Sequence, residues 1–175
     1  MMPCWISWST GVWLGSLQVG FYLLLETHVT AAYLIYFSMV AVWLTGMMAG
    51  LSVNPKYERW LMWLALAAFY AAADQLRTSP RGVMLIIVFL SIAVCGFYSG
   101  QFFVARRRLF PHVGQLFWWE NTGSLVGWVV STVSWLLWGE SALLWVPLVG
   151  FAGMLSGRWA AIRPRSEYLL RSKAP

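Results

Sequence analysis

The residues best suited to chemistry gather near one end of two predicted apolar helices. They are Gln101, Arg106, Arg107, Arg108, Glu120 and Asn121. A charged side chain at the centre of a membrane helix costs about 2.5–3.5 kcal/mol on insertion scales, so such groups normally face protein or a wet cavity. The arginine run is close enough to offer Glu120 a cationic partner. Two interpretations follow: a site for a substrate, a proton or a lipid headgroup, or a structural cluster of hydrogen bonds and ion pairs. We favour the structural cluster.

The other residues capable of metal or covalent chemistry do not combine into a site. His28 and His112 fall at opposite ends of predicted membrane helices, so they cannot ligate one haem iron together. Cys4 and Cys95 are far apart, and we expect neither a disulfide nor a metal pair. We find no nucleophile beside a base, no phosphate-binding glycine loop and no paired carboxylates. The sequence therefore indicates no enzyme activity, no cofactor and no catalytic or metal-ligating residue.

The composition is typical of a membrane protein. The chain has 175 residues, of which 60% are hydrophobic and 10% charged, whereas soluble domains carry about 25% charged residues. Its thirteen tryptophans suit membrane interfaces, where an indole finds both apolar and polar surroundings. No signal-peptide pattern is evident at the start of the sequence. The net charge of +6 lies mainly near the ends of apolar stretches, and we expect no nucleic-acid partner.

Six apolar stretches have the length of membrane helices, at ~1.5 Å per residue across a core of ~30 Å. The connections between them are short, so consecutive helices should be antiparallel neighbours. We therefore predict an all-α, polytopic membrane helical bundle of about six transmembrane helices arranged as three hairpins. Residues 1–160 would form a single transmembrane domain and residues 161–175 a basic cytoplasmic tail. The stretches are Trp5–Leu25, Ala31–Val53, Trp60–Leu76, Val83–Val104, Gln115–Trp138 and Ser141–Ala160.

Basic residues are divided unevenly between the two ends of these helices. Ten of the twelve fall on one side, and only Arg77 and Arg81 fall on the other. Because cytoplasmic loops carry an excess of lysine and arginine, we predict that both termini are cytoplasmic. The expected location is a cell membrane, most simply the inner membrane of a bacterium. The run Arg106–Arg108 fits a topology signal, and an anionic-lipid or partner-docking site is the alternative interpretation.

Glycine pairs with the spacing G-x-x-x-G occur in five of the six stretches. Small residues at this spacing place a flat face on a membrane helix, against which another helix backbone can pack closely. We therefore predict that these glycines are helix-packing positions in a compact bundle. The pairs are Gly11 with Gly15, Gly46 with Gly50, Gly96 with Gly100, Gly123 with Gly127, and Gly153 with Gly157.

Two segments resemble the membrane domains of spermidine synthase-like proteins. These segments are YLIYFSMVAVWLTGMMAG, residues 33–50, and GFYSGQFFVARRRLFPHVGQLFWWENTGSLVGW, residues 96–128. Glu26 also falls where those domains tend to carry an acid. The resemblance implies a multi-span, major-facilitator-like bundle. The soluble aminopropyltransferase domain to which such bundles are usually fused is absent from this sequence, so we carry over no transferase activity.

Two functions remain open. The first is a non-catalytic accessory or scaffold subunit of a larger membrane complex, for example an electron-transfer or photosynthetic one. The second is a small transporter-like module for a polyamine, a lipid or another small molecule, working as a dimer because six helices are half a facilitator. The polar residues lie near one interface rather than in the middle of the membrane, which favours the first. The expected partners are the lipid bilayer and either other membrane subunits or a second copy of the chain.

Overall fold

The computed structural model describes residues 2–29, 32–78 and 83–171, with side chains for residues 4–29, 33–78 and 85–157. Over these residues the chain is all-α, as predicted, and contains no strand. The α-helices are α1 (Met2–Val29), α2 (Ala32–Ser52), α3 (Glu58–Thr78), α4 (Val83–Arg106), α5 (Val113–Trp138) and α6 (Glu140–Arg171), and a short 3-10 helix is η1 (Arg107–Leu109).

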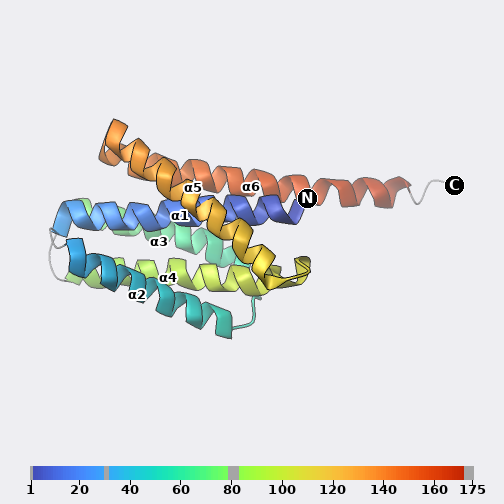
Figure 1. Cartoon of the computed structure of the whole chain (residues 1–175), viewed down its shortest axis with the longest axis horizontal. Coiled ribbons are helices and arrows are strands. Elements are labelled where there is room, and N and C mark those ends of the chain that lie inside the picture. The colour runs from blue at the N-terminus through green and yellow to red at the C-terminus, as the bar shows by residue number, and fades with distance from the viewer. Residues whose placement is uncertain (1, 30–31, 79–82, 172–175) are drawn as a thin grey trace.

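Local sequence explains where several helices end. α2 stops just before Asn54 and Pro55, because a proline disfavours helical backbone in the residue that precedes it. α5 is followed by Gly139, whose φ of 68° is a conformation that glycine adopts without strain. α6 then begins at the next residue. The predicted domain boundary at residue 160 is not a helix end, since α6 continues to Arg171 and projects past the other helices in Figure 1.

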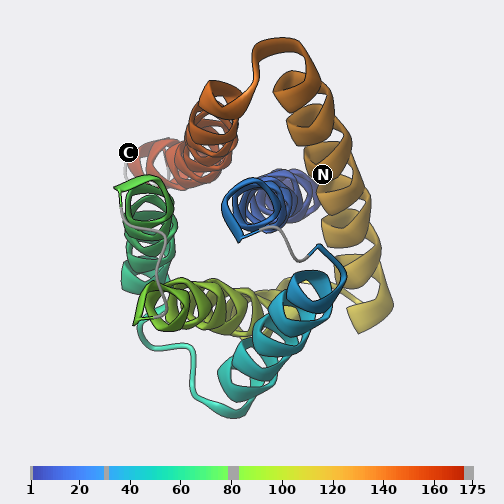
Figure 2. The same cartoon turned by 90° about the vertical axis from the view of Figure 1, so that its left-hand side faces the viewer.

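The other five helices lie around α1 (Figure 2). α1, α3 and α5 run in one direction and α2, α4 and α6 in the other, so the N-terminus and the end of α6 lie at the same end of the bundle (Figure 1). Figure 2 shows α1 at the centre, surrounded by the other helices. The side chains of Trp13, Leu17, Phe21 and Leu24 on α1 are 0% exposed. The core is therefore built on α1.

Glycines bring α1 and α5 into backbone contact. A Cβ on Gly11 or Gly15 of α1 would overlap backbone atoms of α5, and one on Gly123 or Gly127 of α5 would overlap backbone atoms of α1. The contacts advance together along both chains, so the two helices are parallel. Four glycines thus form one interlocked seam, as expected where small residues let membrane helices approach closely.

α2 and α4 form a second seam of the same kind. A Cβ on Gly46 or Gly50 of α2 would overlap the backbone of α4, and one on Gly96 or Gly100 of α4 would overlap the backbone of α2. These two helices are also parallel, and they run opposite to α1 and α5. The fifth predicted pair differs: a Cβ on Gly153 would meet nothing within 4 Å, and one on Gly157 would meet the side chain of Trp5 rather than a backbone.

The two seams are related by a partial internal symmetry, which the contacts of α1 with α2 and of α5 with α6 do not follow. If α1, α2 and α3 are matched to α4, α5 and α6, the contact α1·α5 corresponds to α4·α2, and α1·α6 corresponds to α4·α3. These are the four most extensive helix contacts. Matched helices run in opposite directions, which is the arrangement of an inverted repeat. Each of the predicted three hairpins has its two helices in contact, most extensively α3 with α4, but the two glycine seams join helices that are not consecutive in the chain.

Three helices are long and apolar enough, taken singly, to cross a membrane. The qualifying segments are Tyr33–Ser52, Leu85–Leu109 and Glu140–Gly157, in α2, α4 and α6. We predicted six such segments, and three qualify among the described residues. α1 and α5 fall short because they are rich in serine, threonine, glycine and tryptophan, and α3 because polar residues follow Ala73 near its end. In α1 and α5 many of these polar side chains are buried against other helices.

We expect Gly96→Ala to destabilise the bundle. The new Cβ would overlap the carbonyl oxygen of Trp43 on α2, and overpacking of this kind typically costs about 1–3 kcal/mol. Gly114→Ala is the matched control, because a Cβ there would meet nothing within 4 Å, and alanine is the better helix former. Thermal unfolding in mild detergent should separate the two variants. Equal midpoints would contradict the close approach of α2 and α4.

Candidate functional site

The predicted polar cluster does not form one site, and its first member, Gln101, is a cap for α2. Its Nε2 donates to the carbonyl oxygens of Gly50 (2.6 Å) and Val53 (2.8 Å). Carbonyls in the last turn of a helix have no partner within that helix. Gln101 is 1% exposed and satisfies two of them from the neighbouring α4. Its contacts are structural.

Arg106, the second member, pairs with a residue that the sequence analysis did not select. Arg106 Nη2 lies 3.6 Å from Glu58 Oε1, and the Glu58 side chain is 8% exposed. Glu58 stands in the first turn of α3 and Arg106 in the last turn of α4, so each charge also matches the dipole of its own helix. Among the described side chains, none of Arg106–Arg108 forms an ion pair with Glu120, contrary to the expected pairing.

Glu120 lies in the contact between α5 and α1. It is 7% exposed, and its Oε1 lies 3.2 Å from Ser124 Oγ. Ser124 Oγ is also within 3.2 Å of the carbonyl oxygen of Gly11. The neighbouring Asn121 is exposed on another face of α5. Glu120 is therefore a buried carboxyl group beside a helix seam, away from both the arginines and the amide with which it was grouped.

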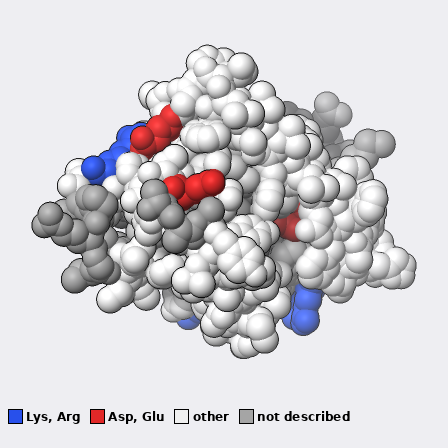
Figure 3. Space-filling model, turned by 60° about the vertical axis from the view of Figure 1, so that its left-hand side comes forward, with Lys and Arg blue, Asp and Glu red and all other residues white. Residues whose placement is uncertain are grey.

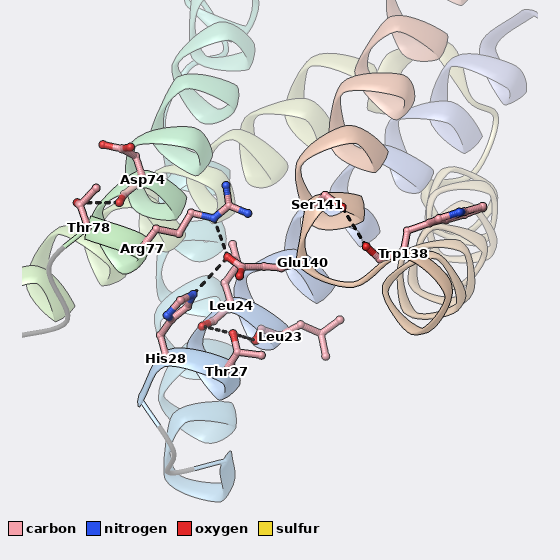
Figure 4. A network of polar contacts seen from close by, with 10 residues as sticks. All are labelled: Leu23, Leu24, Thr27, His28, Asp74, Arg77, Thr78, Trp138, Glu140 and Ser141. Atoms are coloured by element: carbon pink, nitrogen blue, oxygen red, sulfur yellow. Dashed lines mark hydrogen bonds and ion pairs between the residues drawn. The ribbon is translucent and has the colours of Figure 1, made fainter.

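A second polar network lies at the opposite end of the bundle. Figure 4 shows His28 of α1 and Arg77 of α3 both pointing at Glu140, the first residue of α6. Arg77 Nε donates to Glu140 Oε1 at 2.6 Å, and His28 Nε2 lies 3.3 Å from the same oxygen. The network joins the ends of three helices that are not consecutive in the chain. The Glu140 side chain is 36% exposed, so solvent screens these pairs and each contributes little by itself.

The two networks are counterparts under the internal symmetry. Glu58 and Glu140 each stand in the first turn of the third helix of a half. Arg106 and His28 each stand in the last turn of the first helix of the other half. Each half thus offers an acid at a helix start to a base at a helix end. This repetition favours a structural role for both pairs.

An apolar groove lies between α1, α5 and α6. It measures about 620 Å³ and opens on the side of the bundle. No charged residue lines it. Its lining includes four indoles and two glycines of α6. These are Trp5, Trp8, Trp138, Trp145, Gly150 and Gly153. A groove of this chemistry is suited to an apolar occupant.

The remaining reactive residues do not converge. The described residues contain no group of three or more histidine, cysteine, aspartate or glutamate side chains that could hold a metal ion. His28 and His112 lie at opposite ends of the bundle, in the last turn of α1 and before α5. Cys95 is buried on α4, where its Sγ lies 3.4 Å from the carbonyl oxygen of Ala65. None of these arrangements provides a nucleophile beside a base.

Comparison with protein-family models, with curated proteins and with solved structures finds no match to this chain. The groove, the polar groups and the surface are therefore the features that bear on its function.

The sequence analysis missed the groove and both of the paired acids. Glu58 carried a usable signal, because it directly precedes Arg59 and Trp60 at the start of an apolar stretch, where an acid suits the helix dipole. No sequence pattern marked the groove, because its shape depends on how far α5 and α6 diverge around α1.

We expect Glu120→Gln to fold with only a small loss of stability. Glutamine keeps the size of the side chain and can still bond to Ser124 on the same helix, so the loss should not exceed the ~0.6 kcal/mol average of hydrogen bonds between membrane helices. Glu120→Leu removes the hydrogen bond and should cost more. Thermal unfolding in detergent measures both, with the exposed Asn121→Ala as a control. A loss for glutamine as large as that for leucine would mean that the charge itself, which both variants lack, holds the helices together.

Proposed function

We propose that this chain is a non-catalytic integral membrane protein whose six helices all cross the bilayer and which serves as a scaffold subunit of a larger complex. The outer surface supports a membrane location. Every outer helix has two or more large apolar side chains that are more than half exposed, among them Leu34, Leu64, Leu90, Val129 and Val149. Soluble monomers rarely expose apolar patches beyond a few hundred Å². Figure 3 shows one face, with few charged side chains among uncharged ones.

The chain direction supports six crossings rather than three. α2, α4 and α6 have the apolar length to span a membrane, and all three run in the same direction (Figure 1). The chain must return across the bilayer between them, and α3 and α5 are the segments that lie alongside and run back. α1 sits among the other five, where its polar side chains are shielded from lipid.

The observation that carries the scaffold proposal is the groove between α1, α5 and α6. Elsewhere in the bundle, each predicted glycine pair seats the backbone of another helix. At Gly153 the same kind of glycine face opens on the groove with no atom within 4 Å. Small residues and indoles in a lipid-facing groove suit an apolar transmembrane helix, because backbone approach replaces the hydrophobic drive that lipid removes. The proposed occupant is a helix of a partner subunit.

A transporter-like module is the second candidate, and the inverted repeat favours it. Secondary transporters are commonly built from such repeats, in line with the resemblance to spermidine synthase-like membrane domains. A smaller cavity of about 210 Å³ lies between α1, α2 and α5, where Trp128 Nε1 donates to Gln18 Oε1 at 3.0 Å. A second six-helix copy facing this cavity would complete a facilitator-like pathway.

The proposed topology predicts which positions are labelled from outside a cell. The end that carries Lys56 and Arg106–Arg108 should be cytoplasmic, since basic residues stay inside. In a Cys4→Ser background, Thr27→Cys and Thr78→Cys should react with an impermeant maleimide in intact cells. Lys56→Cys should react only after the membrane is permeabilised. Labelling of Lys56→Cys in intact cells would overturn the orientation.

The scaffold role predicts that Gly153→Leu abolishes assembly without unfolding the chain. A Cβ there would meet nothing within 4 Å, and the rest of the leucine would project into the groove where the partner helix is proposed to pack. In mild-detergent extracts of native membranes, the parent should migrate well above the 19.9 kDa chain, and the variant should migrate as a single chain with an unchanged unfolding midpoint. Gly114→Leu, at another open position, is the control and should assemble normally.

Three results would count against the scaffold. A parent that migrates as a single chain would contradict it directly. Co-purification of tagged with untagged copies would identify the occupant as a second copy and favour the transporter. Normal assembly of Glu120→Gln with a specific loss of polyamine or cation uptake in vesicles would establish transport.

A further inference from the structure

We propose that the basic end of the bundle contains a binding site for the phosphate group of an anionic phospholipid, between η1 and the loop that joins α2 to α3. The inference rests on the membrane location proposed above but not on the scaffold role. It concerns a cavity of about 150 Å³, separate from the groove and lined by Asn54, Pro55, Val104, Ala105, Arg107 and Arg108.

The three consecutive arginines have different roles. Arg106 is turned to the buried Glu58, which neutralises it. Arg107 and Arg108 form the 3-10 turn η1, are exposed and line the cavity. A simple topology signal needs only positive charge near the membrane surface. Here the turn also places two arginine residues at a single concave site.

The chemistry of the lining suits a phosphate diester. Guanidinium groups present paired N–H donors that match phosphate oxygens, and such charge-assisted bonds are about twice as strong as neutral ones. The side chain of Asn54 adds an amide to the lining. Val104, Ala105 and Pro55 supply an apolar wall against which the glycerol part of a lipid can pack. A phosphate with an attached apolar portion fits this mixture better than a bare inorganic ion.

The depth of the cavity points to a lipid as the source of the phosphate. The apolar segments Tyr33–Ser52 and Leu85–Leu109 both end at this cavity, so it lies where hydrocarbon gives way to headgroups. Basic pockets at the cytoplasmic ends of membrane helices are a known setting for anionic headgroups. The site thus combines two arginines, a concave shape and the correct depth.

The test compares two double variants that lose the same charge at the same end of the bundle. Arg107→Gln with Arg108→Gln removes the cavity arginines. Lys56→Gln with Arg59→Gln removes two exposed basic side chains that do not line the cavity. Each purified protein in neutral detergent is titrated with short-chain phosphatidylglycerol, with short-chain phosphatidylcholine and with inorganic phosphate. Native mass spectrometry counts the bound lipid, and thermophoresis gives the dissociation constant.

We expect the parent to bind one phosphatidylglycerol in preference to phosphatidylcholine. The cavity variant should bind it at least about tenfold more weakly than the control variant, a difference of about 1.4 kcal/mol. A third variant, Arg107→Lys with Arg108→Lys, keeps the charge but loses the paired donors, and it should fall between the two. That variant keeps the test valid if the glutamine pair folds poorly.

Three outcomes would overturn the proposal. Equal weakening of the cavity and control variants would mean diffuse attraction to the whole basic end. Equal affinity of the parent for the two lipids would mean that no anion site exists. Competition by inorganic phosphate at the affinity of the lipid would assign the site to a free phosphate. None of these results bears on assembly through Gly153, so the scaffold proposal stands or falls separately.

Discussion

The close backbone approach along the two glycine seams is the constraint on which this bundle depends. Inside a membrane, lipid tails are as apolar as leucine, so helices associate through packing and hydrogen bonds rather than through the hydrophobic effect. Gly11 and Gly123 provide such contact between α1 and α5, and Gly46 and Gly96 between α2 and α4. Each seam holds two parallel helices, which the chain can connect only by intervening helices. The seams therefore fix the relative direction of α1 and α5 and of α2 and α4.

Close packing also dictates how polar groups are handled. Where helices touch, no water remains to satisfy a donor or acceptor, so each polar group needs a protein partner. Gln101 bonds to two carbonyls at the end of α2, and Tyr70 donates its hydroxyl to the carbonyl of Leu144 on α6 at 2.5 Å. Thr10 and Ser16, both buried, bond back to carbonyls of their own helix, a local solution open to hydroxyl side chains. The polar groups of the interior thus hold the helices together, and the outer surface is where a partner or lipid could bind.

Much of the helical framework could be predicted from the sequence, but little of the pairing could. Apolar length located each helix to within a few residues except at the end of α6. Glycine spacing identifies a flat face but not the helix that packs on it, so Gly153 looked the same as Gly96 although it faces an open groove. The partner of Arg106 was also beyond reach, because Glu58 is more distant in sequence than Glu120 and becomes its neighbour only when α3 packs on α4. Local patterns report local structure, and both the groove and the ion pairs arise from packing between distant segments.

The internal symmetry separates what the fold requires from what has been added to it. At both ends of the bundle an acid at the start of one helix pairs with a base at the end of another, so those pairs belong to the repeated framework. The connections beside them differ. α5 and α6 are joined by Gly139 alone, whereas five residues separate α2 from α3, and η1 follows α4. Because one residue is enough to join α5 to α6, the five-residue loop between α2 and α3 and the two exposed arginines of η1 are not required by the repeated framework. The cavity lined by Arg107 and Arg108 is thus an addition to the repeat, which favours a role in binding over a role in folding.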